Sequence, residues 1–175
     1  MDWLEIKEFI KDTAKIVLFI IIILFIVQYV FSITKVVGSS MYPTLKDEEI
    51  LVLNKFKYRI SNVKRGDIIS LKYADTKYLI KRVIGVPNDT ISIKDSVLYI
   101  NSEKYEEEYI SKELIYPDFD LSDLGYAKIP ENMYLVLGDN RENSLDSREI
   151  GLIKKEDIIG KVSLRFWPLN KFSFI

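Results

Sequence analysis

The amino-acid sequence predicts a mainly β domain attached to one N-terminal transmembrane helix. The helix is predicted by an uncharged apolar run over residues 16–33, IVLFIIIILFIVQYVFSI. The β domain is predicted by short runs of β-branched and aromatic residues, separated by turn-forming stretches such as RGD, VPND and GDN. With 175 residues, the chain is long enough for one main domain with a sizeable core.

The apolar run has the length of a membrane span. As a helix, residues 16–33 would extend about 27 Å, close to the thickness of a bilayer's hydrocarbon core. We therefore predict a transmembrane helix over residues 16–34. A buried core helix is disfavoured because a small domain cannot surround a helix that is apolar on every side. A cleavable signal peptide is disfavoured because the run is long and no Ala lies between Ala14 and Ala74 to form a cleavage site.

Residues 1–15 are predicted to form an amphipathic lead-in at the cytoplasmic membrane interface. Their large apolar side chains fall at helical spacing: Trp3, Leu4, Ile6, Phe9 and Ile10. The same segment carries three lysines: Lys7, Lys11 and Lys15. Basic residues beside a span favour a cytoplasmic N-terminus. We accordingly expect residues 35–175 to lie outside the cell membrane.

The predicted outer domain consists of short strands in an antiparallel arrangement. The strand-like runs are EEILVLNKF, DIISLKY, KYLIKRVIG, TISIKDSVLYI, MYLVLGD and IIGKVSLRFW. Residues 101–131 are acidic and less regular, which predicts a surface excursion containing a short helix. The acidic pair Glu48 and Glu49 and the acidic run at residues 106–108 are interpreted as solvated faces. The aromatic C-terminal segment, FWPLNKFSFI, is compatible with membrane contact or, for Phe166 and Trp167, with core packing.

The composition excludes several chemistries. The formal net charge of -1 offers no general attraction for nucleic acid, so we expect no nucleic-acid partner. The chain contains no Cys and no His, which removes disulfides, thiolate nucleophiles, the usual zinc ligands and any Ser-His-Asp relay. We expect neither a metal nor a cofactor.

Two serines in the segment GSSMYPTL, residues 38–45, raise the question of which residue could activate a serine hydroxyl. Without histidine, a neutral lysine is an available base, and lowering a lysine pKa by three units needs about 4 kcal/mol. Lys81 is the candidate because it lies in the apolar strand YLIKRVIG, on one face with Leu79 and Val83. An edge-strand lysine that reaches water remains an alternative.

Four sequence blocks together resemble the conserved boxes of type I signal peptidases. They are GSSMYPTL, RGDIISLKY, YLIKRVIGVPNDTI and GDNRENSLDSR, and they have the order and spacing of that family. The resemblance covers most of the chain, including the final IIGKVSLRFWP, but not residues 101–131. It implies an antiparallel, β-barrel-like catalytic domain of the signal-peptidase type, on an N-terminal anchor in the plasma membrane.

The resemblance also implies a function. Ser40 would be the nucleophile and Lys81 its general base, forming an acyl-enzyme while removing signal peptides from exported preproteins. The substrates would carry small residues, especially Ala, at the first and third positions before the cut. Met41 and Pro43, beside the nucleophile, would contact the substrate.

Further residues acquire supporting roles by the same resemblance. The oxyanion would be held by the Ser40 amide, while the hydroxyl that some members carry two positions earlier is replaced here by Gly38. Ser39 would shape the backbone or assist.

In the last box, Ser144 would orient the lysine, Asp146 and Arg148 would form a bracing ion pair, and Asp139 would be structural. Two other functions remain open, namely a self-cleaving Ser/Lys regulator and a non-enzymatic membrane-anchored β module that binds exported chains.

Overall fold

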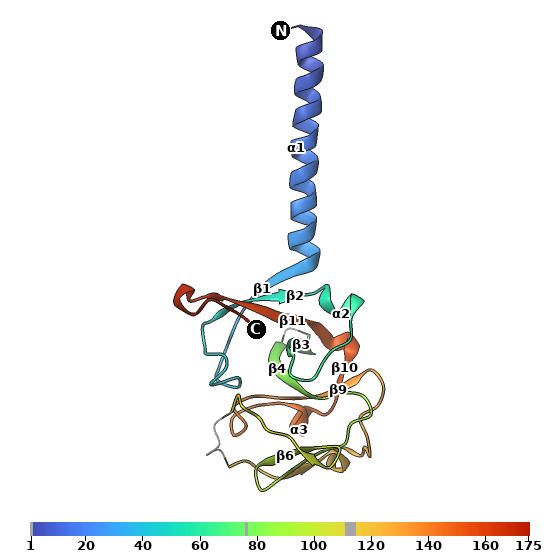
Figure 1. The fold of residues 1–175 in the computed structure, drawn as a ribbon, viewed down its shortest axis with the longest axis vertical. Helices are drawn as coiled ribbons and strands as arrows, with labels where there is room; N and C mark the ends of the chain where they lie inside the picture. The colour runs from blue at the N-terminus through green and yellow to red at the C-terminus, as the bar shows by residue number, and fades with distance from the viewer. Residues whose placement is uncertain (1, 76, 111–114) are drawn as a thin grey trace.

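The computed structural model describes residues 2–75, 77–110 and 115–175. A long helix, α1 (Trp3–Val30), projects from a β domain built of two antiparallel sheets (Figure 1). The larger sheet lies next to the helix, and the smaller sheet lies at the far end of the domain. The prediction of a mainly antiparallel β fold with an N-terminal apolar helix is confirmed.

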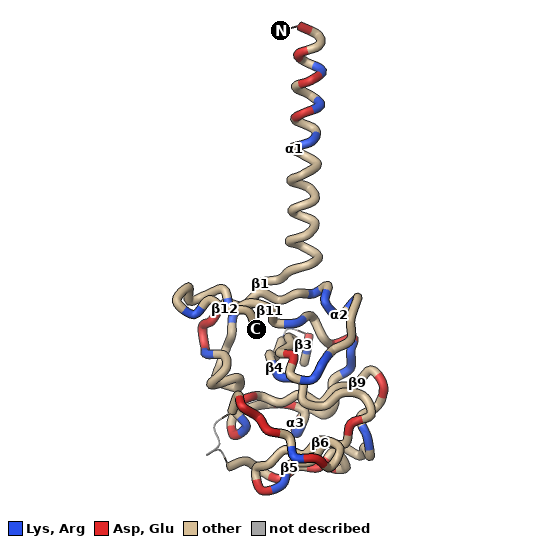
Figure 2. Tube along the Cα trace, in the orientation of Figure 1, with Lys and Arg blue, Asp and Glu red and all other residues tan. Residues whose placement is uncertain are grey.

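Helix α1 is long enough to cross a membrane. Its 28 residues extend about 42 Å, and none of them is buried in the domain. The helix begins after Asp2, whose carboxylate accepts a hydrogen bond from the Trp3 amide while Glu5 accepts one from the Asp2 amide. The charged residues of α1 all lie in its N-terminal half, as Figure 2 shows. The predicted lead-in and span are therefore one continuous helix.

The helix ends at Val30, four residues before the predicted boundary. Strand β1 (Phe31–Lys35) follows directly and pairs antiparallel with β2 (Ile50–Asn54). The Lys55 amide donates to the Val30 carbonyl, and the Lys55 amine donates to the Gln28 carbonyl. Because β2 and Lys55 satisfy these backbone groups, the chain turns into the sheet where the apolar pattern alone predicted more helix.

The large sheet has the strand order β1-β2-β11-β3-β4-β9-β10, with β12 paired to β11. Its other strands are β3 (Ile68–Ala74), β4 (Lys77–Gly85), β9 (Met133–Leu137), β10 (Ile153–Lys154), β11 (Ile158–Trp167) and β12 (Ser173–Phe174). The sheet curves like part of a barrel but does not close. Strand β4 is central, with Lys81 opposite Ile69 of β3 and Arg82 opposite Leu137 of β9.

The small sheet has the order β7-β6-β5-β8. Its strands are β5 (Ile91–Lys94), β6 (Val97–Ile100), β7 (Glu103–Lys104) and β8 (Phe119–Asp120). Short helical segments complete the fold: α2 (Lys57–Ile60), η1 (Leu121–Leu124), α3 (Ser147–Ile150), η2 (Lys155–Asp157) and η3 (Leu169–Lys171).

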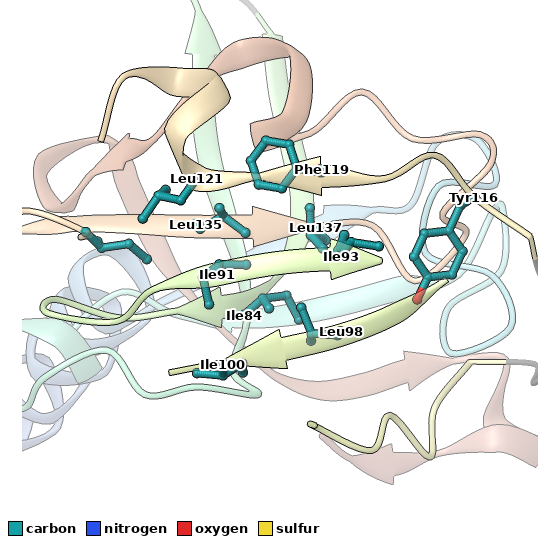
Figure 3. Packing of buried hydrophobic residues seen from close by; sticks show 11 residues of the cluster. Ile84, Ile91, Ile93, Leu98, Ile100, Tyr116, Phe119, Leu121, Leu135 and Leu137 are labelled. Atoms are coloured by element: carbon teal, nitrogen blue, oxygen red, sulfur yellow. The ribbon is translucent and has the colours of Figure 1, made fainter. Parts of the chain in front are cut away.

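Residues 101–131 are more than a surface excursion. They supply β7 and β8, and four of their side chains are buried in the core between the sheets: Tyr116, Phe119, Leu121 and Ile129. Figure 3 shows this packing, in which Leu135 and Leu137 of the large sheet meet Ile91 and Ile93 of the small sheet. The predicted short helix is η1, and residues 111–114 lie outside the described part of the chain. The acidic composition of residues 101–131 led to the surface prediction, although these four apolar side chains belong to the core.

Candidate active site

The segment between β1 and β2, residues 36–49, is termed here the Ser40 loop. Three of its apolar side chains, Val36, Met41 and Leu45, are buried in a core that includes residues of β2, β3 and β11. The Val36 amide donates to the Glu49 carbonyl at 2.8 Å, which closes the base of the loop. Buried apolar anchors and a closed base hold a polar loop tip in one position.

Lys81 faces the tip of this loop from the central strand β4. Its side chain is 2% exposed, and its Nζ lies 2.7 Å from Ser40 Oγ. The alternative of an edge-strand lysine reaching water is therefore wrong. Burial lowers the pKa of Lys81 from 10.5 to about 8, against the smaller opposing effects of Asp146 and Asp139. At pH 7 about a tenth of the amine is therefore neutral, far more than for an ordinary lysine.

A second segment, residues 138–148, packs against the Ser40 loop and is termed here the Gly138 loop. The Asn140 amide donates to the Ser40 carbonyl at 3.0 Å, and the Asn140 side chain donates to the Ser39 carbonyl at 3.2 Å. The Asn143 side chain donates to Ser39 Oγ at 3.1 Å. A Cβ at Gly138 would lie 2.5 Å from the Ser40 carbonyl oxygen, so the two loops meet where no side chain fits.

Two carboxylates of the Gly138 loop form buried ion pairs. Asp146 accepts from Arg148 Nε at 2.9 Å and from the Gly138 amide at 3.0 Å. Asp139 is paired in a fork with Arg82, at 2.8 Å from Nε and 2.7 Å from Nη2. Both carboxylates are fully buried. Paired, hydrogen-bonded charges of this kind fix a loop because neither partner can be withdrawn alone without a large penalty.

The other residues singled out from the sequence lie around this centre. Gly38 has a φ of 86°, a conformation that favours glycine, and its amide donates to Asp47 at 2.8 Å. The Ser144 hydroxyl is buried and, within the described ranges, has no hydrogen-bond partner. Met41 is 1% exposed and offers a peptide little surface, whereas Pro43 is exposed.

Two acidic residues that were interpreted as solvated are buried instead. Glu49 is 3% exposed, and its Oε2 lies 3.1 Å from Arg165 Nε. Glu107 is buried against Arg141. Their neighbours Glu48, Glu106 and Glu108 are exposed, as interpreted from the sequence. Glu49 and Glu107 can be buried because an arginine from a distant strand or loop supplies the partner that a buried carboxylate requires.

Sequence reasoning also missed the roles of Arg82 and Arg141. Arg141 belongs to the GDNRENSLDSR block, which was a signal that its side chain is structurally constrained. Nothing in the acidic run at residues 106–108 distinguishes its middle member. Such a pairing depends on the tertiary fold.

A serine hydroxyl beside a buried lysine amine is an arrangement typical of hydrolases that use serine as nucleophile and lysine as base. The comparisons with known proteins identify the group. Residues 6–167 match the family model described as "Signal peptidase, peptidase S26". The chain thus belongs to the S26 signal peptidases, a family of serine endopeptidases.

Individual relatives resemble the chain over nearly its whole length. Signal peptidase I P of Bacillus subtilis subsp. natto is 41% identical over 172 residues, covering 94% of this chain and 93% of the relative. Signal peptidase IB of Staphylococcus aureus strain MRSA252 is 36% identical, covering 96% and 94%. The crystal structure of a signal peptidase I from Enterococcus faecalis V583 is 36% identical, with a TM-score of 0.54 over 59% of this chain and 99% of that one.

The family resemblance predicted from the four sequence blocks is therefore confirmed. Together with the apolar helix α1, family membership indicates a membrane-anchored protein.

Proposed function

We propose that this chain is a membrane-anchored signal peptidase that removes N-terminal signal peptides from exported preproteins, with Ser40 as nucleophile and Lys81 as general base. The observation that carries the proposal is the 2.7 Å separation of Lys81 Nζ and Ser40 Oγ, with the amine almost fully buried. The family supports signal-peptide removal as the reaction. The dyad gives that reaction a base in a chain without histidine.

The proposed acylation begins with neutral Lys81, which removes the hydroxyl proton of Ser40. Ser40 Oγ then bonds to the carbonyl carbon of the scissile peptide bond, and the carbonyl oxygen takes the negative charge. When the C–N bond breaks, the Lys81 ammonium gives its proton to the leaving amine, which is the new N-terminus of the mature protein. The signal peptide remains as an ester on Ser40.

Deacylation repeats the same steps with water. Neutral Lys81 removes a proton from the water, the hydroxide bonds to the ester carbon, and the C–O bond to Ser40 breaks. The Lys81 ammonium returns its proton to Ser40 Oγ, which regenerates the enzyme. One amine thus serves both half-reactions, which requires a pKa near the working pH.

The Ser40 amide is the proposed donor to the oxyanion. It has no acceptor within the part of the chain that the structure describes. The Gly38 amide already donates to Asp47, and glycine supplies no hydroxyl. A single oxyanion donor contributes about 2.7 to 4 kcal/mol in other serine enzymes. Ser39, fixed by Asn140 and Asn143, would hold the Ser40 amide in place.

Ser144 is proposed to orient the Lys81 amine during the reaction. Its buried hydroxyl packs against Gly138, beside the Ser40 carbonyl. A buried hydroxyl without a partner is costly, so a hydrogen bond between the Ser144 hydroxyl and the Lys81 amine during the reaction would be favourable. Asp139, and Asp146 with Arg148, would keep the surrounding loop rigid.

The proposed topology places residues 1–15 at the cytoplasmic face, α1 in the membrane and residues 35–175 outside. The orientation follows from the lysines near the N-terminus. The hairpin formed by β11, η3 and β12 lies in the same sheet as β1, the strand that follows α1. This hairpin exposes a set of large apolar side chains: Phe166, Trp167, Leu169, Phe172 and Phe174. Their exposure argues against core packing, and we propose that they contact the bilayer surface.

The proposed substrate is an extended peptide with small residues, especially Ala, at the first and third positions before the cut. Pro43 is exposed beside Ser40 and is the proposed contact. At most about 18 Å of extended chain separates Ser40 from the end of β1, the strand that continues α1, so we propose that the peptide reaches the active site near the membrane.

The test is cleavage of a purified preprotein by the full chain in detergent, with N-terminal sequencing of the product. We expect wild type to cleave at one site and both Ser40→Ala and Lys81→Ala to lose cleavage. Lys77→Ala, at an exposed lysine on the same strand, is the control and should cleave normally. Full activity in either dyad variant would refute the mechanism. A wild-type protein that neither cleaves preproteins nor reacts with an acylating penem would favour a non-enzymatic module.

A further inference from the structure

We propose that Glu107 is a positioning residue for the reaction, which acts through Arg141 to hold the Gly138 loop against Ser40 and Lys81. This inference rests on the proposed function of the Ser40–Lys81 pair. It gives a role in catalysis to residues 101–131, which lie outside the four sequence blocks that resemble the family's conserved boxes.

Glu107 and Arg141 form a buried, forked ion pair. The side chains are 4% and 0% exposed, and Arg141 Nη1 lies 2.8 Å from Glu107 Oε2 while Nη2 contacts Oε1. The two residues are 34 positions apart in the sequence. Because an unpaired charge is very unfavourable in such a place, Glu107 determines where the Arg141 guanidinium lies.

Arg141 transmits this position to the Gly138 loop through two further contacts. Its Nε donates to the Gly138 carbonyl at 2.9 Å, and its own carbonyl accepts from Arg148 Nη2 at 2.8 Å. Arg148 in turn pairs with Asp146, which accepts from the Gly138 amide. Both backbone groups of Gly138 are therefore held by this network, at the point where the loop touches the Ser40 carbonyl.

Tyr109 connects the same segment to the other ion pair of the site. Its hydroxyl donates to Glu107, and the guanidinium of Arg82 stacks 3.8 Å from the centre of its ring. Burial, and then the neighbouring Glu107, raise the pKa of Tyr109 far above its ordinary value, so the phenol remains a donor. Arg82 is the partner of Asp139. Glu107 thus contacts Arg141 within the Gly138 loop, and Tyr109 contacts Arg82, the partner of Asp139 in the same loop.

Loss of the Glu107 charge should therefore affect the reacting groups as well as stability. A loop that withdraws admits water to Lys81 and moves Asp146 and Asp139, the two carboxylates that act on the amine. Hydration raises the pKa of Lys81, while loss of the carboxylates lowers it. In the folded protein, burial acts on the pKa of Lys81 more strongly than the two carboxylates do. Partial loss of burial should therefore outweigh partial loss of the carboxylates, and we expect the pKa of Lys81 to rise.

The experiment compares preprotein cleavage by full-length Glu107→Gln with that of wild type in detergent. Glu106→Gln and Glu108→Gln are matched controls, because both neighbours are more exposed than Glu107 and neither pairs with Arg141. We expect kcat to fall about 100-fold in Glu107→Gln, the effect of a small misplacement of reacting groups, with KM little changed. The midpoint of its kcat/KM pH profile should move above that of wild type, and both controls should match wild type.

The double variant Glu107→Gln/Arg141→Met separates positioning from stability. It removes both buried charges, so its melting temperature should exceed that of Glu107→Gln. Its kcat should stay low, because a methionine in place of Arg141 has no donor for the Gly138 carbonyl. Recovery of wild-type kcat in the double variant would overturn the proposal.

Glu107→Asp keeps a carboxylate and provides a second measurement if Glu107→Gln does not fold. It should retain more activity than Glu107→Gln but less than wild type, because the shorter side chain holds Arg141 less well. Full wild-type kinetics in Glu107→Asp would also overturn the inference.

The outcomes distinguish this inference from the proposed function. If Glu107→Gln has wild-type kcat and an unchanged pH profile while Ser40→Ala and Lys81→Ala are inactive, the positioning role fails and the dyad stands. If the dyad variants themselves remain active, the proposed function fails first.

Discussion

Replacing Lys81 by methionine should make the protein more stable at neutral pH while abolishing cleavage. Burial lowers the pKa of Lys81 from 10.5 to about 8, and each unit corresponds to about 1.36 kcal/mol. At pH 7 the folded protein therefore holds a buried ammonium at a cost of about 3 kcal/mol relative to the unfolded chain. Methionine has a similar length and no charge. Loss of the hydrogen bond to Ser40 offsets about 1 kcal/mol, which leaves a net gain of about 2 kcal/mol.

The pH dependence of this gain gives its physical cause. Between pH 8 and 10.5 the unfolded chain binds a proton at this lysine that the folded protein has released, so wild-type stability rises with pH in that window. The stability advantage of Lys81→Met should accordingly shrink by about 2 kcal/mol between pH 7 and pH 9.5. Contributions of other titrating groups are common to both proteins and cancel in the difference.

The assay is equilibrium urea unfolding of the full chain in detergent, followed by near-UV circular dichroism. With a urea dependence of about 2 kcal/mol per molar, the midpoint of Lys81→Met at pH 7 should lie about 1 M above that of wild type. Lys77→Met, on the exposed part of the same strand, should show no such pH-dependent difference. A Lys81→Met protein that is no more stable than wild type at pH 7, with a pH-independent difference, would refute the argument that the amine is desolvated.

Two further predictions concern activity. The kcat/KM of wild type should rise with pH to a plateau with its midpoint near 8, because only the neutral amine of Lys81 acts as base; a flat profile from about pH 6 to 10 would contradict this assignment. Gly138→Ala should lower kcat about 100-fold, because its Cβ would lie 2.5 Å from the Ser40 carbonyl oxygen. Combining it with Ser144→Ala removes the clash with the Ser144 hydroxyl but leaves Ser144 Cβ and the Ser40 carbonyl oxygen each 2.5 Å from the new Cβ. The double variant should therefore be less active than Ser144→Ala alone, and equal activity of these two variants would count against the close loop packing.

Local sequence patterns predicted the central strands and the candidate pair. The alternation in YLIKRVIG placed Lys81 with Val83, and both are buried on β4. The end of α1 was predicted less well, because the uncharged residues 31–33, Phe-Ser-Ile, fit a membrane helix and a strand equally. Residues 31–33 form a strand because they pair with β2, which lies about twenty residues further along the chain.

The difference between local sequence patterns and contacts made only by the fold also explains which residues of the site were missed. Ser40 and Lys81 have a chemical signature, since a histidine-free chain with a serine in a family box needs another base. Glu49 and Glu107 have no such signature, because each resembles its acidic neighbours in the sequence. Their burial depends on Arg165 and Arg141, which are brought close only by the fold.

The arginines of the site also explain how a lysine can be a base beside two carboxylates. Asp139 and Asp146 alone would stabilise the Lys81 ammonium and keep its pKa high. Each is paired with an arginine, Arg82 or Arg148, whose positive charge offsets the field of the carboxylate at the amine. Burial then remains the larger effect on Lys81 and lowers its pKa. The buried ion pairs therefore make the Gly138 loop rigid while leaving Lys81 able to lose its proton near neutral pH.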